Sequence, residues 1–183
     1  MHKLSSLVAG EWTEHSHLPV YEREDHSPEY ERLVAGMPAQ GSKPFAHLVR
    51  LLAPPYFLLY VLHTPRGEAE PGRYQSPAIS GDRFETFIGE FGDYLAADAR
   101  FDIWVHSPQD RATIVWDRHG VLFGYGPIAR FAAALETLGF SEGRPSIPSP
   151  HVHHYRAEYD AQAKRMIDEF EWVFSELRPE DEQ

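Results

Sequence analysis

Residues 101–139 constrain the fold of this chain more than any other stretch, because three short apolar runs are separated there by clear turn signals. In the first run, FDIWVH, apolar and more polar residues alternate, which is the period of a strand with one buried face. Pro108 stands where a type I turn favours proline, and Gly120 can adopt the left-handed conformation that a bulged hairpin needs. We therefore predict a three-stranded antiparallel meander over 101–106, 112–116 and 121–125.

Amphipathic runs on both sides of the meander predict helices. Apolar residues recur every three to four positions in each of these runs, and several begin at a serine, an aspartate or a proline suited to a first helical turn. The predicted helices span about 43–52, 82–95, 127–138 and 155–177. A run that is apolar on both faces, 56–63, predicts a strand in the middle of the sheet.

The order of these elements predicts an α+β fold. We expect a mixed, mostly antiparallel sheet of about four strands in a β-α-β-β-β-α core, packed by amphipathic helices and followed by a long C-terminal helix. Residues 1–41 show no sustained period of 3.6 or 2, and Pro28–Ala35 has room for one short helix at most. The expected organisation is an irregular N-terminal arm (1–41), a single α+β domain (42–178) and a frayed acidic tail (179–183).

Charge and cysteine content narrow the class of protein. The net charge is −11, and the excess of acid is concentrated in residues 11–31 and 156–183. A chain without a basic stripe does not suit nucleic acid, whereas an acidic surface can dock a basic protein partner. There is no cysteine and no signal-peptide pattern, and the longest apolar run is too short to cross a bilayer. We expect a soluble cytoplasmic protein.

The histidines of Pro150–Tyr155, PHVHHY, are the main candidates for a metal site. In an extended segment, His151 and His153 lie on the same face, and two imidazoles placed in this way can bind zinc or nickel. Such a site needs a third ligand from elsewhere. The candidates are Glu158 or Asp160 in the following helix, of which either could instead act as a base, and His106 or Asp102 from the meander. The alternative interpretation is a polar loop that caps the last helix.

Two further polar segments can be weighed as sites. The long connection 64–80 contains Arg73, Tyr74 and Gln75, which offer a guanidinium, an aromatic ring and an amide to an anionic substrate if the loop reaches the histidines. The turn Asp117-Arg118-His119 pairs an acid with an imidazole. Adjacent side chains seldom point at one another, however, and a solvated turn explains this segment.

Known catalytic motifs are absent from the sequence. There is no HExxH metalloprotease motif, no GxSxG nucleophile elbow, and no GxGxxG or Walker phosphate loop. The first functional hypothesis is therefore a protein-binding or regulatory module that uses the acidic C-terminal helix or the sheet face that helices leave free. The alternative is a metal-assisted hydrolase or lyase, with the cluster at 151–154 acting on a small anionic substrate; whether the chain is an enzyme stays open at this point.

Overall fold

The largest element of the fold is a nine-stranded mixed sheet. The computed structural model describes residues 2–27, 30–38 and 41–181. Along the sheet the strands are ordered β10-β3-β4-β9-β8-β7-β5-β6-β12, and every neighbouring pair is antiparallel except β10 and β3. The strands are β3 (Val20–Ser27), β4 (Tyr30–Gly36), β5 (Phe57–Leu62), β6 (Gly72–Gln75), β7 (Phe101–Ser107), β8 (Ala112–Trp116), β9 (Val121–Tyr125), β10 (Ser141–Glu142) and β12 (Val173–Ser175).

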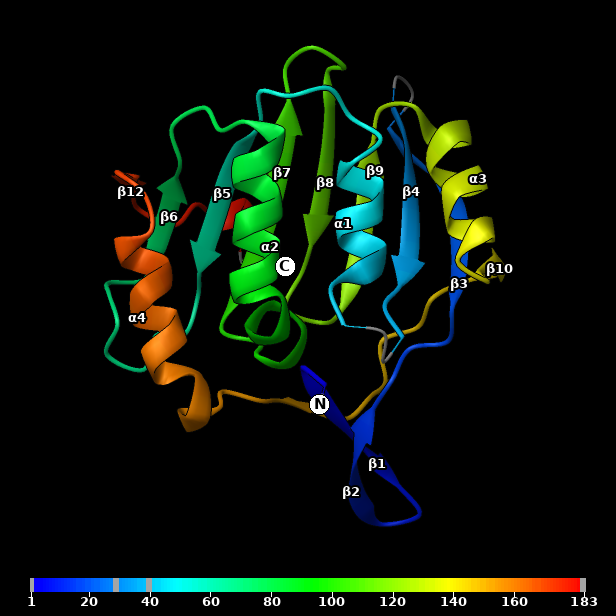
Figure 1. Ribbon diagram of the computed structural model, residues 1–183. Coiled ribbons are helices and arrows are strands. Elements are labelled where there is room, and N and C mark those ends of the chain that lie inside the picture. Colours follow the sequence, from blue (N-terminus) through cyan, green and yellow to red (C-terminus); the bar gives the residue numbers. More distant parts are fainter. Residues whose placement is uncertain (1, 28–29, 39–40, 182–183) are drawn as a thin grey trace.

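A second sheet of three strands lies at one end of the large sheet. It has the order β11-β1-β2, with β1 (Leu4–Val8) in the middle, β2 (Glu11–His15) at one edge and β11 (His151–His153) at the other. The β1–β2 hairpin extends away from the body of the molecule (Figure 1). This sheet therefore brings together two segments from opposite ends of the chain.

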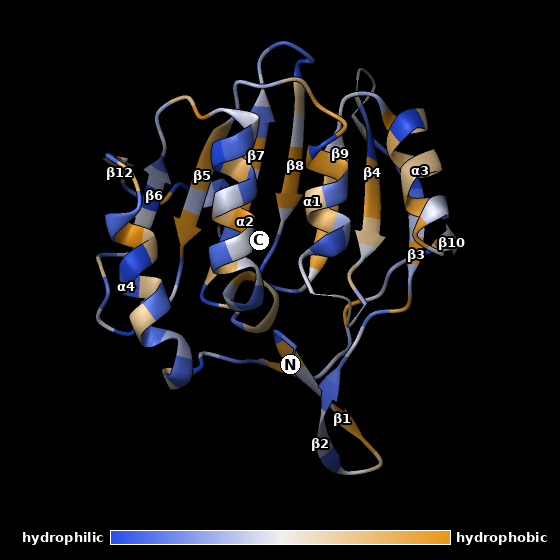
Figure 2. Cartoon of the chain, in the orientation of Figure 1, coloured by the Kyte–Doolittle hydropathy of each residue, from blue (hydrophilic) through white to orange (hydrophobic). Residues whose placement is uncertain are grey.

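The four α-helices of the described residues lie on one face of the large sheet (Figure 1). They are α1 (Lys43–Val49), α2 (Gly81–Ala97), α3 (Ile128–Thr137) and α4 (Asp160–Asp168). The α2 helix begins at Ser80, whose side chain accepts a hydrogen bond from the Arg83 backbone N–H, as an N-cap residue does. The core forms where α1, α2 and α3 pack their apolar sides on the sheet, and the strands behind the helices are largely hydrophobic (Figure 2).

No α-helix of the described residues lies on the opposite face of the sheet. In β5, Tyr60 points toward the helices and bonds the hydroxyl of Tyr94 on α2, so the alternate residues Phe57 and Leu59 point the other way. On this second face the C-terminal segment is held by an ion pair between Arg73 and Asp181. Most of the free face is left to strand side chains alone.

The predicted four-stranded core with a long C-terminal helix is wrong. The meander and the first three helices form near the predicted positions, but they belong to a sheet of nine strands. Residues 4–36, which we expected to lie in an irregular arm, contain four strands, and Tyr30–Gly36 is β4 where a short helix was considered. Pro28 lies outside the described residues.

Two segments near the β12 edge of the sheet account for the remaining differences between the predicted and the observed fold. The predicted 155–177 helix is wrong at both ends, because α4 begins at Asp160 and stops at Asp168. Beyond its end the Trp172 indole N–H donates to the Met166 carbonyl, which satisfies a backbone acceptor of the last turn. Residues 173–175 then form β12, which pairs with β6 inside the connection predicted to be a structureless loop. No helix in the described ranges is long and apolar enough to cross a membrane.

Candidate metal site of three histidines

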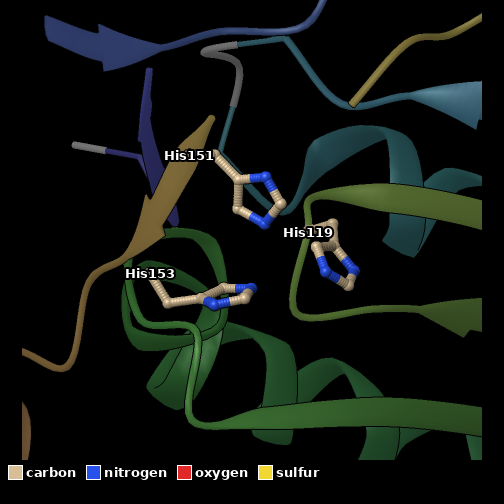
Figure 3. A group of neighbouring side chains, drawn as sticks. All are labelled: His119, His151 and His153. Carbon is tan, nitrogen blue, oxygen red and sulfur yellow. The ribbon is translucent and has the colours of Figure 1, made fainter. Parts of the chain in front are cut away.

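Three histidines from two different sheets converge at the end of the large sheet that faces the small one. His119 lies in the turn between β8 and β9, and His151 and His153 lie on β11. One ring nitrogen of each residue lies within 4.8 Å of one ring nitrogen of the other two, and the three rings point toward a common centre (Figure 3). The ring centroids are 4.9 to 5.5 Å apart.

Strand geometry places the two β11 histidines together. His153 pairs with Leu4 and His151 pairs with Ser6 on β1, so the two residues are two positions apart on one extended strand. Alternate residues of a strand share a face, which was the basis of the sequence prediction. The structure adds the third imidazole.

The carboxylate of Asp117 orients His119. One oxygen accepts a hydrogen bond from the His119 Nδ1–H at 2.9 Å, and the other accepts the backbone N–H groups of His119 and Val121 at 3.0 and 2.7 Å. Because Nδ1 carries the proton, Nε2 is left with a free lone pair. A carboxylate that orients a ligand histidine in this way is a common outer partner in metal sites.

His151 and His153 also each leave one ring nitrogen available to an ion. His151 donates its Nδ1–H to the carbonyl of Pro148 at 2.8 Å, which frees its Nε2. The Nε2 of His153 is buried and has no hydrogen-bond partner in the described structure. Burial, followed by the neighbouring His119 and His151, lowers the pKa of His153 to about 4, so this ring is neutral at pH 7.

A buried lysine secures the turn that carries His119. Lys3 is 3% exposed, and its ammonium donates to the Asp117 carbonyl at 2.9 Å while lying 4.8 Å from the ring centres of Phe101 and Trp116. Burial lowers the pKa of Lys3 to about 8. The same turn is held from the other side by Asp102, whose carboxylate accepts the Arg118 backbone N–H at 2.7 Å.

The chemistry of the ligand set fits a transition metal. Three neutral imidazole nitrogens suit zinc, nickel or copper better than magnesium or calcium, which prefer oxygen. The nitrogen atoms must move closer together to reach one ion at the usual distance of about 2.0–2.1 Å from zinc. The three side chains are half-buried, which leaves room for that adjustment and for solvent.

The other predicted metal ligands lie outside this cluster. Asp102 is at the same end of the sheet, but its carboxylate bonds His63 at 2.9 Å in addition to Arg118. His106 is at the far end of β7, where its Nδ1 lies 3.0 Å from the Thr113 hydroxyl.

The residues considered as catalytic acids or bases are engaged in ion pairs. Asp160 accepts hydrogen bonds from Arg66 at 2.9 Å and from Arg100 at 3.1 Å, and the bond to Arg66 is the largest cause that lowers its pKa. Glu158 lies 3.9 Å from Arg156 on the surface. Neither carboxylate belongs to the group around His119.

The residues considered for substrate binding lie on β6 rather than on a loop that covers the histidines. Arg73 is paired with Asp181 at 2.5 Å, and Tyr74 is buried with its hydroxyl bonded to the Glu70 carbonyl. Arg73 and Gln75 line a groove of about 420 Å³ on the helix-free face, together with His106. This groove and the three histidines are separate sites.

His119, the residue that completes the cluster, was not proposed as a metal ligand from the sequence. Asp117 and His119 were interpreted as a solvated turn, yet the tight turn does direct the carboxylate to the imidazole two residues later. The Asp-x-His spacing next to Gly120 was the available signal. Its proximity to β11 depends on contacts across the fold that no local pattern records.

No protein-family model matches the chain, and neither a curated protein nor a solved structure is significantly similar to it. The argument for function therefore depends on the geometry of the site.

Proposed function

We propose that this protein binds a divalent transition metal ion, with zinc as the best match, through His119, His151 and His153. The observation that carries this proposal is that each imidazole presents a nitrogen that bonds no other described residue. Asp117 and the Pro148 carbonyl occupy the opposite nitrogens of His119 and His151, and the Nε2 of His153 is buried without a partner among the described residues.

A site with three protein ligands leaves a coordination position for water. Zinc sites of this kind are typically catalytic, since the ion lowers the pKa of the bound water and makes it a nucleophile near neutral pH. The alternative hypothesis from the sequence, a metal-assisted hydrolase or lyase, is thus the reaction class that we propose for this site. The role of this chain's residues would be to hold the ion and keep one position open.

The test is the metal content of protein purified without a histidine tag. We expect about one equivalent of zinc after dialysis and a loss of at least about 100-fold in affinity when His119, His151 or His153 is replaced by alanine. The matched control is His106→Ala, which removes an imidazole at the opposite end of β7 and should keep full affinity. Less than about a tenth of an equivalent in the wild-type protein would refute the proposal.

The net charge of −11 favours a second candidate function, docking of a basic protein partner. The C-terminal segment that contains Glu171 and Glu176 would meet this partner, because the groove on the helix-free face is lined by apolar residues and Arg73. A cysteine-free chain suits the reducing cytoplasm as the place of this encounter. Charge reversal at the exposed Glu171 and Glu176 should weaken capture of basic proteins, and unchanged capture would argue against docking through this acidic segment.

A further inference from the structure

The groove on the helix-free face of the large sheet has the size and the lining of a small-molecule site. Its volume of about 420 Å³ lies within the range of about 300–1,000 Å³ found for such sites. Phe57, Leu59 and Trp104 give it an apolar surface, and Arg73 and Gln75 line it with them. Two of these side chains are aromatic and offer flat surfaces to a ligand.

Strand register fixes the position of these side chains. Leu59 on β5 pairs with Trp104 on β7 and with Gln75 on β6, so the three residues form one row across the sheet. Residues directly opposite one another point to the same face, and this row points away from α2 because the neighbouring Tyr60 points toward it. The floor of the groove therefore belongs to three paired strands and not to a loop.

The charge of the groove contrasts with that of the whole chain. The chain has 28 acidic residues against 17 lysines and arginines, yet none of the described residues that line the groove is acidic. The guanidinium of Arg73 lies 5.9 Å from the centre of the Trp104 ring, so its positive charge stands beside the apolar floor. A guanidinium in this position suits a ligand that carries a carboxylate.

Arg73 already binds one carboxylate in the structure. Its Nη1 donates to Asp181 of the C-terminal segment, and the two side chains are 12% and 2% exposed. A guanidinium has five N–H groups, and no other hydrogen bond joins this one to a described residue. Arg73 therefore keeps N–H groups for a second acceptor.

Trp104 contributes a further donor. Its Nε1–H is buried and has no partner in the described part of the chain. Buried polar groups in native proteins are nearly always hydrogen-bonded, so an unpaired one indicates a partner that comes from outside the chain. The indole N–H thus favours a ligand with an acceptor over a purely apolar one.

We infer that this groove binds a small organic carboxylate with a flat apolar body. The body packs on Phe57, Leu59 and the ring of Trp104, and the carboxylate accepts hydrogen bonds from Arg73 and from the Trp104 N–H. Asp181 competes with the ligand, because its own carboxylate bonds the same guanidinium. The site is independent of the metal proposed at the three histidines.

The experiment compares two probes of nearly the same shape, the anion 1-naphthoate and its neutral amide, 1-naphthamide. Their dissociation constants for the full chain are measured by calorimetry, with and without a metal chelator. We expect the wild type to bind 1-naphthoate at least about tenfold more tightly than 1-naphthamide, because hydrogen bonds to a charged acceptor are the stronger ones. The chelator should change neither constant, since the groove holds no metal ligand of the proposed site.

The two partners of the ion pair should respond in opposite directions. Arg73→Gln should weaken 1-naphthoate binding by at least about tenfold, because the anion loses its cationic partner. Asp181→Asn should strengthen it by at least about threefold, because a competing charge is removed while an oxygen remains for the Arg178 backbone N–H. Binding of 1-naphthamide should stay within about threefold of wild type in both variants. A purely structural role of the pair would weaken binding in both.

Tryptophan signals locate the probe in the groove. The chain has four tryptophans, and the indole N–H signal that Trp104→Phe removes from an ¹⁵N spectrum should shift when 1-naphthoate is added to the wild type. Trp104→Phe keeps an aromatic ring without the N–H and should weaken 1-naphthoate binding by at least about threefold. The matched control is Trp12→Phe on the projecting hairpin, where Trp12 is 51% exposed, and it should bind as the wild type does.

Each contrary outcome overturns a stated part of the inference. Equal affinity of the wild type for the two probes would rule out a carboxylate as the preferred ligand, and no binding of 1-naphthoate at about 5 mM would rule out the site. Binding that disappears with the chelator would place the probe on the metal and not in the groove. Weaker binding in both Arg73→Gln and Asp181→Asn would make the ion pair structural. None of these results changes the metal content, so the proposed function stands or falls separately.

Discussion

Replacement of Asp117 by asparagine should weaken metal binding much more than it weakens the fold. The carboxylate accepts three hydrogen bonds, and in two of them one oxygen accepts from the backbone N–H groups of His119 and Val121. The amide oxygen of asparagine can keep those two. The third bond, from the His119 Nδ1–H, is lost, because the amide N–H₂ is itself a donor.

The expected magnitude follows from this difference. The amide favours the His119 tautomer with the proton on Nε2, which is the nitrogen that the ion needs. Loss of an outer hydrogen-bond partner lowers metal affinity by about 10- to 100-fold, equivalent to about 1.4–2.7 kcal/mol. The free energy of unfolding of the metal-free protein should fall by only about 1 kcal/mol, the contribution of one hydrogen bond.

The assay is a zinc titration in competition with a coloured chelator, combined with urea unfolding of the metal-free protein. Asp110→Asn is the matched control, because Asp110 lies in the turn at the other end of β7 and accepts a hydrogen bond from the Ala53 backbone N–H. It should leave zinc affinity unchanged. A folded Asp117→Asn protein whose zinc affinity stays within about threefold of wild type would refute the tautomer argument.

Three further predictions concern stability. Lys3 has a folded-state pKa of about 8, below the ordinary value of 10.5, so the unfolded chain binds more protons between these pH values and the free energy of unfolding should rise with pH there. In urea unfolding, the wild type should gain up to about 3 kcal/mol over Lys3→Met between pH 8 and pH 10.5. Parallel pH curves of the two proteins would contradict this. Gly126 has φ +130° and no room for a Cβ, so Gly126→Ala should lower the unfolding free energy by more than about 2 kcal/mol. Gly139 has φ +87° with open space around it, so Gly139→Ala should lower the unfolding free energy by only about 1 kcal/mol. Equal losses in urea unfolding would show that the close contact at Gly126 is irrelevant. Arg100 and its partner Asp98 are fully buried, so Arg100→Met should lower the unfolding free energy by about 3–5 kcal/mol in the same assay. A loss below about 1 kcal/mol would mean that the Asp98 carboxylate finds another partner.

Local patterns predicted the elements whose boundaries are marked by turn residues. The strands of the meander and the helix that ends before Gly139 form as expected, because proline and glycine fix the backbone at their ends. The strands in residues 20–36 were missed, since β3 is rich in charged residues and its sequence therefore shows no clear alternation of apolar and polar residues. The final β12 strand was taken for helix because its apolar residues continue the helical spacing past the turn at Trp172.

The candidate site was predictable only in the part that one strand encodes. The shared face of His151 and His153 follows from their spacing, and the structure places them together. The third residue, His119, is brought to them by the packing of one sheet against another. That contact depends on Lys3 at the other end of the sequence, which bonds the carbonyl of Asp117, and no local pattern contains it.

The division of the three histidines between two sheets has a consequence for the unfolded chain. An ion held by His119 and His151 would close a loop of about 30 residues in a protein that has no cysteine to form a disulfide. Restricting a loop of that length removes unfolded-state entropy worth about 4 kcal/mol on the chain-entropy scale used for disulfides. Unlike a disulfide, this cross-link would form and break with the concentration of free metal and would be indifferent to the redox state of the compartment.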